Sequence, residues 1–261
     1  LSVGFMVAFP VVGWAVQRSG WRSAWLAVGL ALLAGLAPLS WLAVPRSPPS
    51  SPQGGFGAAG PLASAVGADV TLGQALRTPA FWVFALGTAL YGLVASGIGL
   101  FNESILAERG FAAEVYYQTL AVTAMTGLAG NFLGGWLAPR ASIGRLLAAS
   151  MFMLAAGLAV LPHVSTQGQV MLWAAAMGIG GGIVMVLFFS VWPRMFGRGQ
   201  LGRIQGAAQT LTVLASAVGP LLLALCLSWT GSYQAMFRIL ALVIAITGIA
   251  AVRVSTVPVQ K

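Results

Sequence analysis

Long apolar runs recur along almost the whole chain, and short segments that carry arginine separate them. An apolar run of about 18 residues or more with few charges can cross the hydrocarbon core of a bilayer as a helix. Only 7% of the residues are charged, whereas roughly a quarter are charged in a soluble domain. The sequence therefore predicts an all-α fold, a polytopic bundle of transmembrane helices.

About eight membrane spans are expected, and they cover residues 1–17, 23–44, 79–101, 115–138, 143–161, 169–192, 204–228 and 233–252. A tight turn at 18–22 separates the first two. Residues 45–70 are rich in Pro, Ser, Gly and Ala, a composition typical of a flexible linker. Residues 71–78 follow as a short amphipathic surface helix with Thr71 as its N-cap, and Pro79 suits the first position of the next helix.

The distribution of charge predicts the orientation of the spans. One alternate set of connections holds nine cations and one acid, whereas the other set holds four cations and three acids. The richer set comprises Arg46, Arg77, Arg140, Arg145, Arg194, Arg198, Arg203, Arg253 and Lys261. Because cytoplasmic connections carry the excess of Lys and Arg, the linker and the C-terminus are predicted to be cytoplasmic. Arginines scattered between spans do not form a nucleic-acid-binding face, and the single Cys226 excludes a disulfide framework.

A weak internal repeat suggests two halves. Pro10 is followed ten residues later by Gly20 and a new span, and Pro220 is followed eleven residues later by Gly231 and a new span. If these positions are equivalent, four further spans would precede Leu1. The chain would then hold the last two helices of a first half-bundle (1–44), a cytoplasmic linker with its surface helix (45–79), a six-helix second half-bundle (80–253) and a cytoplasmic tail (254–261).

A glycine- and arginine-bearing turn carries a family resemblance. The segment 134–140, Gly-Gly-Trp-Leu-Ala-Pro-Arg, includes Gly135 and Arg140 and leads to Arg145. It resembles the cytoplasmic loop that follows the second helix of each half in the major facilitator superfamily of transporters. Pro139 stands where the fuller motif has an aspartate, so the salt-bridge role of that aspartate is not carried over.

Longer segments extend the resemblance over essentially the whole chain, as the fifth to twelfth helices of that fold. Gly219 and Pro220 resemble the glycine–proline element of a fifth helix in a half, and residues 71–101 and 196–221 look most like the bacterial oxalate/formate-antiporter and monocarboxylate-transporter branch. The resemblance implies a carrier in a bacterial inner membrane that moves a small solute, with a small organic anion as the favoured class, by alternating access between two half-bundles. Carriers of that branch hold anions with basic residues inside the C-terminal half, but the spans 115–138 and 204–228 have no cation near the middle, which argues against an oxalate-like dianion.

Substrate-binding candidates are polar residues deep in the spans, because such carriers bind substrate near the bilayer midplane. They are Tyr91, Asn131, Gln209 and Arg238. The alternatives are a tyrosine bonded to a neighbouring helix and an arginine that reaches outward to the interface. Asn102 is expected at the solvated outer end of its span.

Small residues mark candidate gating or packing positions. Gly130 and Gly134 form a small-xxx-small pair that favours close helix packing, and Gly219 with Pro220 is a further candidate. The glycine run from Gly178 to Gly182 favours a flexible gate and close packing about equally.

No catalytic, metal or cofactor site is expected, since there is one histidine, one cysteine and no carboxylate at mid-depth in any span. An intramembrane enzyme is therefore disfavoured, whereas a channel or a structural membrane subunit stays open. The expected partners are the lipid bilayer, a small-molecule substrate and the missing N-terminal helices of the same protein. Residues 1–261 alone are not expected to transport, because half of the cleft would be absent.

Overall fold

The computed structural model describes residues 2–36, 38 and 70–254, and every regular element among them is helical. The chain divides into two compact units, Leu1–Ala65 and Val66–Lys261. The prediction of an all-α, polytopic helical bundle is confirmed by the helices of the second unit. The predicted linker up to residue 69 and the predicted tail from 255 onward lie outside the described residues.

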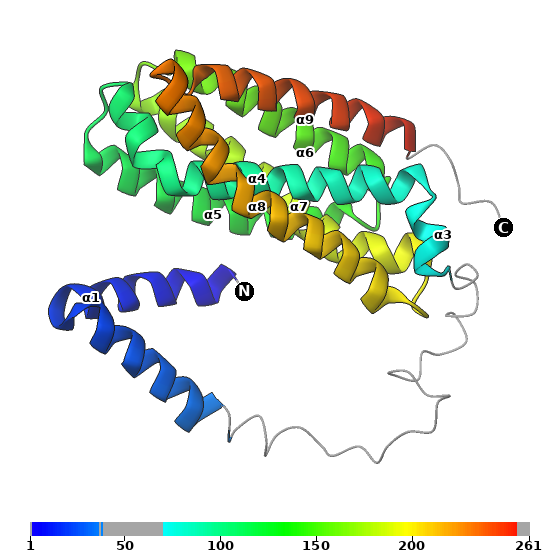
Figure 1. Ribbon diagram of the computed structural model, residues 1–261, viewed down its shortest axis with the longest axis horizontal. Helices are drawn as coiled ribbons and strands as arrows, with labels where there is room; N and C mark the ends of the chain where they lie inside the picture. Colours follow the sequence, from blue (N-terminus) through cyan, green and yellow to red (C-terminus); the bar gives the residue numbers. More distant parts are fainter. Residues whose placement is uncertain (1, 37, 39–69, 255–261) are drawn as a thin grey trace. The chain divides into compact units, whose positions relative to one another are not determined.

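The first unit contains one bent helix, α1 (Ser2–Ala31), and a π-helical turn (Leu32–Leu36). Within α1 only Gly20 has non-helical geometry, with φ 79° and ψ 158°. A positive φ of this kind is accessible to glycine at little energetic cost. Figure 1 shows the two arms of α1 meeting at an angle. The predicted five-residue turn at 18–22 is therefore wrong in extent, because a single glycine changes the direction of the helix.

The second unit contains one short helix and six long ones. They are α3 (Leu72–Leu76), α4 (Pro79–Glu108), α5 (Ala113–Leu137), α6 (Ile143–Val160), α7 (Gln167–Phe196), α8 (Leu201–Thr230) and α9 (Gln234–Val254), with a 3₁₀ turn (Leu161–His163) after α6. Among the described residues, the six long helices are long and apolar enough to cross a membrane. They match the last six predicted spans, and the largest difference is at the end of α4, which continues seven residues beyond 101. The first two predicted spans are not among the six.

Local sequence signals account for several helix ends. The Thr71 hydroxyl accepts a hydrogen bond from the Gln74 amide while the Gln74 side chain accepts one from the Thr71 amide, so α3 begins with a capping box. Thr78 caps α4, and Pro79 occupies its first turn, where a missing N–H leaves no helical bond unmade. The predicted surface helix with Thr71 at its N-cap is thus present.

The six long helices pack as two copies of a three-helix repeat. The principal packed pairs are α5 with α7, α4 with α8, α6 with α9, α6 with α7, and α4 with α9. Exchanging α4, α5 and α6 for α7, α8 and α9 interchanges α5–α7 with α4–α8 and α6–α7 with α4–α9, and it leaves the pair α6–α9 unchanged. Because each repeat has three helices, α4 and α7 run in opposite directions, so the repeats are inverted (Figure 1).

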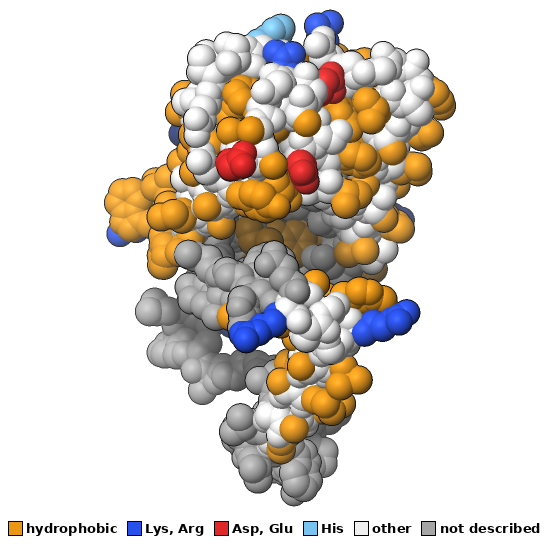
Figure 2. All heavy atoms as spheres, turned by 90° about the vertical axis from the view of Figure 1, so that its left-hand side faces the viewer, with side chains coloured by type: hydrophobic (Ala, Val, Ile, Leu, Met, Phe, Trp, Pro, Cys, Tyr) orange, Lys and Arg blue, Asp and Glu red, His pale blue; other side chains and the backbone are white. Residues whose placement is uncertain are grey.

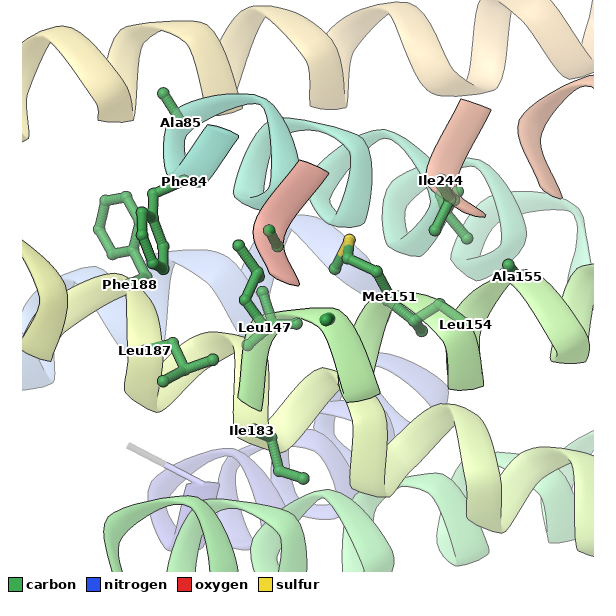
Figure 3. Packing of buried hydrophobic residues seen from close by; sticks show 14 of the residues in the cluster. Phe84, Ala85, Leu147, Met151, Leu154, Ala155, Ile183, Leu187, Phe188 and Ile244 are labelled. Atoms are coloured by element: carbon green, nitrogen blue, oxygen red, sulfur yellow. The ribbon is translucent and has the colours of Figure 1, made fainter. Parts of the chain in front are cut away.

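The core of the second unit lies between α4, α6, α7 and α9. Figure 3 shows Leu147 and Met151 of α6 facing side chains of the neighbouring helices, such as Leu187 of α7 and Ile244 of α9. In contrast, α5 and α8 are the least buried of the six. Their outer faces expose large apolar side chains such as Phe132, which is 73% exposed. An apolar face of this kind is stable against lipid or another apolar helix, but not against water.

Charged side chains separate to the two ends of the second unit. Among residues 70–254, the end formed by α3, the α5–α6 turn, the α7–α8 loop and the end of α9 carries arginines and no acid. The acids Glu103, Glu108 and Glu114 lie at the opposite end, which faces the viewer in Figure 2. This asymmetry follows the predicted difference between alternate connections.

Candidate functional site

Tyr91 occupies the central crossing of α4 and α7. It is the thirteenth of the thirty residues of α4, and Gly181 is the fifteenth of the thirty residues of α7. A methyl group added at Gly181 would lie 2.6 Å from the Tyr91 phenol oxygen and 2.8 Å from its Cε2 atom. The ring therefore rests on the α7 backbone at mid-depth. Its hydroxyl makes no hydrogen bond to any residue in the described part of the chain.

Asn131 of α5 approaches α7 at the next glycine. A methyl group added at Gly182 would lie 2.8 Å from the backbone nitrogen of Asn131, so this contact is made by the main chain. The ring of Tyr91 and the backbone of Asn131 thus lie against neighbouring residues of α7, although they come from different helices.

The other two candidates are placed differently. Gln209 is an exposed side chain on α8, one turn before Thr212, which faces α4. Arg238 is the fifth residue of α9 and is also exposed. Neither is packed on the glycine run of α7 as Tyr91 and Asn131 are.

Glycines bring α5 and α7 into backbone contact. A methyl group at Gly130 would lie 2.5 Å from the Ile179 carbonyl oxygen, and one at Gly134 would lie 3.2 Å from the Ile183 Cα atom. One at Gly178 would lie 2.6 Å from the Thr123 carbonyl oxygen. Since α7 is a continuous helix through its glycine run, this geometry favours close packing over a bend among the two interpretations left open by the sequence.

A second seam of small residues joins α4 and α8. A methyl group at Gly219 would collide with the Leu93 carbonyl oxygen and would lie 2.8 Å from the Ser96 hydroxyl. One at Gly92 would lie 2.6 Å from the Ser216 hydroxyl. This pair of helices is the counterpart of α5 and α7 in the inverted repeat, so both pairs are packed through glycine.

Pro220 explains a hydrogen bond across the α4–α8 seam. A proline inside a helix has no N–H, so the carbonyl four residues earlier, that of Ser216, loses its helical donor. The Ser96 hydroxyl of α4 donates to that carbonyl oxygen at 2.7 Å. In the membrane interior, where water is scarce, such a bond replaces the missing one. Ser96 is not among the sequence-predicted candidates, although Pro220 signals an unpaired carbonyl four residues earlier, for which a partner could be sought.

The Ser96 bond gives a double-mutant prediction. We expect Ser96→Ala to lower the free energy of unfolding by about 1–2 kcal/mol, because it leaves the Ser216 carbonyl without a donor. In a Pro220→Ala background the main chain supplies that donor, so the same substitution should lose at least about half of its effect. Denaturant unfolding of the four proteins measures both. An equal loss in the two backgrounds would show that the bond does not compensate for the proline.

Asn102 corrects one expectation. It was predicted at a solvated helix end, but α4 continues to Glu108 and the Asn102 side chain is only 5% exposed. Its Nδ2 donates to the Thr119 hydroxyl of α5 at 3.1 Å. Glu103, the next residue, is exposed. Around residues 102 and 103, α5 therefore covers the face of α4 that carries Asn102, whereas the face that carries Glu103 is exposed.

The turn between α5 and α6 is held by arginines. Arg140 donates to the Trp136 carbonyl oxygen at 2.8 Å, and its guanidinium lies 4.8 Å from the centre of the Trp136 ring. Arg194, near the end of α7, donates to the Ala138 carbonyl oxygen at 2.7 Å. A methyl group at Gly135 would meet nothing within 4 Å, and Arg145 is exposed. Within the described residues, no group of three His, Cys, Asp or Glu side chains could hold a metal ion.

These features define a multi-pass membrane protein of the transporter class: apolar helices in inverted three-helix repeats, crossed at mid-depth by polar side chains. The model of the Major Facilitator Superfamily matches residues 1–220, and the chain belongs to this family. Its members are membrane transporters rather than enzymes. A comparison with curated proteins gave no match.

Proposed function

We propose that the chain is part of a secondary active transporter that moves a small solute by alternating access between two half-bundles. In this proposal residues 80–253 form the C-terminal half-bundle, and residues 1–44 are the last two helices of the N-terminal one. Family membership and the inverted repeats of the second unit support it. The least buried helices, α5 and α8, are the ones with faces free to meet the other half.

The placement of the Tyr91 side chain on the central glycines of α7, beside the backbone of Asn131, carries the proposal. A carrier needs polar groups near the bilayer midplane that are held by rigid packing yet still reach a solute. The packing of Tyr91 on Gly181 fixes the ring, and its hydroxyl stays without a partner among the described residues. We assign Tyr91 and Asn131 to the solute-binding surface of this half.

The substrate class we propose is a small organic anion, after the branch that the sequence resembles. Arg238 is the arginine farthest from a helix end among residues 70–254. It is therefore the cation of this range that lies deepest in a span, where an anionic solute could contact it. The arginine-rich end is assigned to the cytoplasm of a bacterial inner membrane, in line with the excess of basic residues there.

Uptake by the complete protein that contains this chain tests the function. Reconstituted in proteoliposomes, it is expected to show saturable uptake of a labelled small carboxylate, and counterflow when the vesicles are preloaded with the unlabelled solute. Both follow from a site that faces one side at a time. Flux that rises linearly with concentration and shows no counterflow would instead identify a channel. Saturable uptake of neutral solutes alone would overturn the anion assignment.

The same assay tests the binding surface. Tyr91→Phe keeps the ring on Gly181 and removes only the hydroxyl, so we expect the KM for the solute to rise about three- to tenfold, the loss of one hydrogen bond. Tyr117→Phe is the matched control, since that tyrosine is 64% exposed near the outer end of α5. Equal KM values for the two variants would remove Tyr91 from the site.

A further inference from the structure

Arginines accumulate at one end of the second unit without neutralising acids. Seven lie there among residues 70–254: Arg77, Arg140, Arg145, Arg194, Arg198, Arg203 and Arg253. The three acids of the same range are all at the other end. The arginine-rich end therefore has a positive potential that favours anions at its surface.

Three of these arginines border the turn between α5 and α6, which we call the corner. Arg194 of α7 donates to the carbonyl oxygen of Ala138, which is two residues before Arg140. Arg145 is on the first turn of α6, directly after this turn. All three side chains are exposed. The corner thus has exposed arginines from the α5–α6 turn, from the first turn of α6 and from the last turn of α7.

The start of α6 adds to the positive potential of the corner. Ser142 is the N-cap residue, but its side chain makes no capping hydrogen bond, and its buried hydroxyl has no partner among the described residues. The first amides of α6 therefore have no side-chain cap. A helix N-terminus carries a partial positive charge that attracts an anion.

Trp136 places the corner at the depth of lipid headgroups. Its ring is 57% exposed, and the Arg140 guanidinium lies over it at 4.8 Å. Exposed tryptophans at the ends of membrane helices are typical of the interface between hydrocarbon and headgroups. The guanidinium above such a ring therefore lies at the level of the lipid phosphates.

We propose that this corner, formed by Arg140, Arg145 and Arg194, binds the phosphate of an anionic phospholipid headgroup. The planar guanidinium group donates paired hydrogen bonds to phosphate oxygens, and basic clusters beside membrane helices recognise anionic lipids. The site is distinct from the proposed solute-binding surface, because it lies at the end of the helices and the solute surface lies at mid-depth.

Native mass spectrometry of the complete purified protein tests the proposal with two probes, phosphatidylglycerol and phosphatidylcholine. Each arginine near an anionic lipid contributes roughly a factor of five in affinity, so the double variant Arg140→Gln and Arg145→Gln should bind phosphatidylglycerol about 25-fold more weakly. The double variant Arg198→Gln and Arg203→Gln removes the same charge from the same end and should change affinity less than about threefold. Binding of phosphatidylcholine should not change.

Two further variants keep the test decisive if the first one unfolds. Arg145→Gln alone alters an exposed side chain and should weaken phosphatidylglycerol binding about fivefold. The double variant Arg140→Lys and Arg145→Lys keeps the charge but loses the paired hydrogen bonds, so its affinity should lie between those of the unaltered protein and the double glutamine variant. Equal losses in the two double glutamine variants would indicate a diffuse charge effect and overturn the corner site. Equal binding of the two lipids by the unaltered protein would overturn it as well.

Discussion

Gly182→Ala is expected to destabilise the protein more than any other single methyl addition in the α7 glycine run. The added carbon would collide with the Gly127 carbonyl oxygen and lie 2.8 Å from the Asn131 amide nitrogen and 2.9 Å from the Gly130 carbonyl carbon. All three are backbone atoms, which cannot rotate away as a side chain can. We expect a loss of about 3 kcal/mol or more, which corresponds to a melting temperature lower by about 6–12 °C.

Gly180→Ala is the matched control, two residues away in the same run. There the methyl group would lie 3.5 Å from the Met153 sulfur and 3.6 Å from Leu154 side-chain atoms, an ordinary van der Waals distance. Since alanine is favoured over glycine inside a helix by about 1 kcal/mol, this variant should melt at or slightly above the temperature of the unaltered protein. Thermal unfolding in detergent compares them. Equal melting temperatures for the two variants would show that α5 and α7 are not in backbone contact.

Trp192→Ala is expected to lower the free energy of unfolding by about 3–5 kcal/mol, because it opens a large cavity. The Trp192 side chain is fully buried, and its ring contacts those of Phe81, Phe188 and Phe196 at centroid distances of 5.6, 6.2 and 6.2 Å. These rings join the start of α4 to the end of α7. Their loss should therefore loosen the arginine-rich end of the unit first.

Two substitutions control for this cavity. Trp192→Phe keeps most of the aromatic volume and removes a buried indole N–H that has no partner among the described residues, so its cost should stay below about 1.5 kcal/mol. Trp136→Ala removes the same type of side chain from an exposed position and should change stability by less than about 1 kcal/mol. Denaturant unfolding of the three variants ranks them. A Trp192→Ala loss no larger than that of Trp136→Ala would contradict the burial of the ring cluster.

Hydrophobic length and local capping rules predicted most of the fold. Helix starts such as that of α4 at Pro79 depend on neighbouring residues only, so they can be read from sequence. The C-terminal end of α4 could not be predicted from sequence. The apolar run weakens at Asn102, but α5 covers that side chain, and the helix continues beyond it. The sequence predicts a turn of several residues around Gly20. It does not show that one glycine is enough to bend a helix that continues on both sides.

The role of the glycines could not be decided from sequence for a related reason. A gate and a close crossing both require small residues at the same spacing. The decision depends on which way each Cα faces: Gly182 faces the backbone of α5, whereas Gly180 faces side chains of α6. Depth in a span does not separate Tyr91 from Gln209 or Arg238, and only the structure shows that its side chain rests on α7.

The two glycine-lined helix pairs also restrict how the unit can deform. Helices whose backbones touch cannot slide or roll past each other without first separating. We therefore expect α4 with α8, and α5 with α7, to move as rigid pairs. Consecutive helices α4 and α5, like α7 and α8, are joined mainly by a short loop and meet only sparsely. Elastic strain during a transport cycle would therefore concentrate between α4 and α5 and between α7 and α8. Thermal fluctuations there should be larger than within either rigid pair.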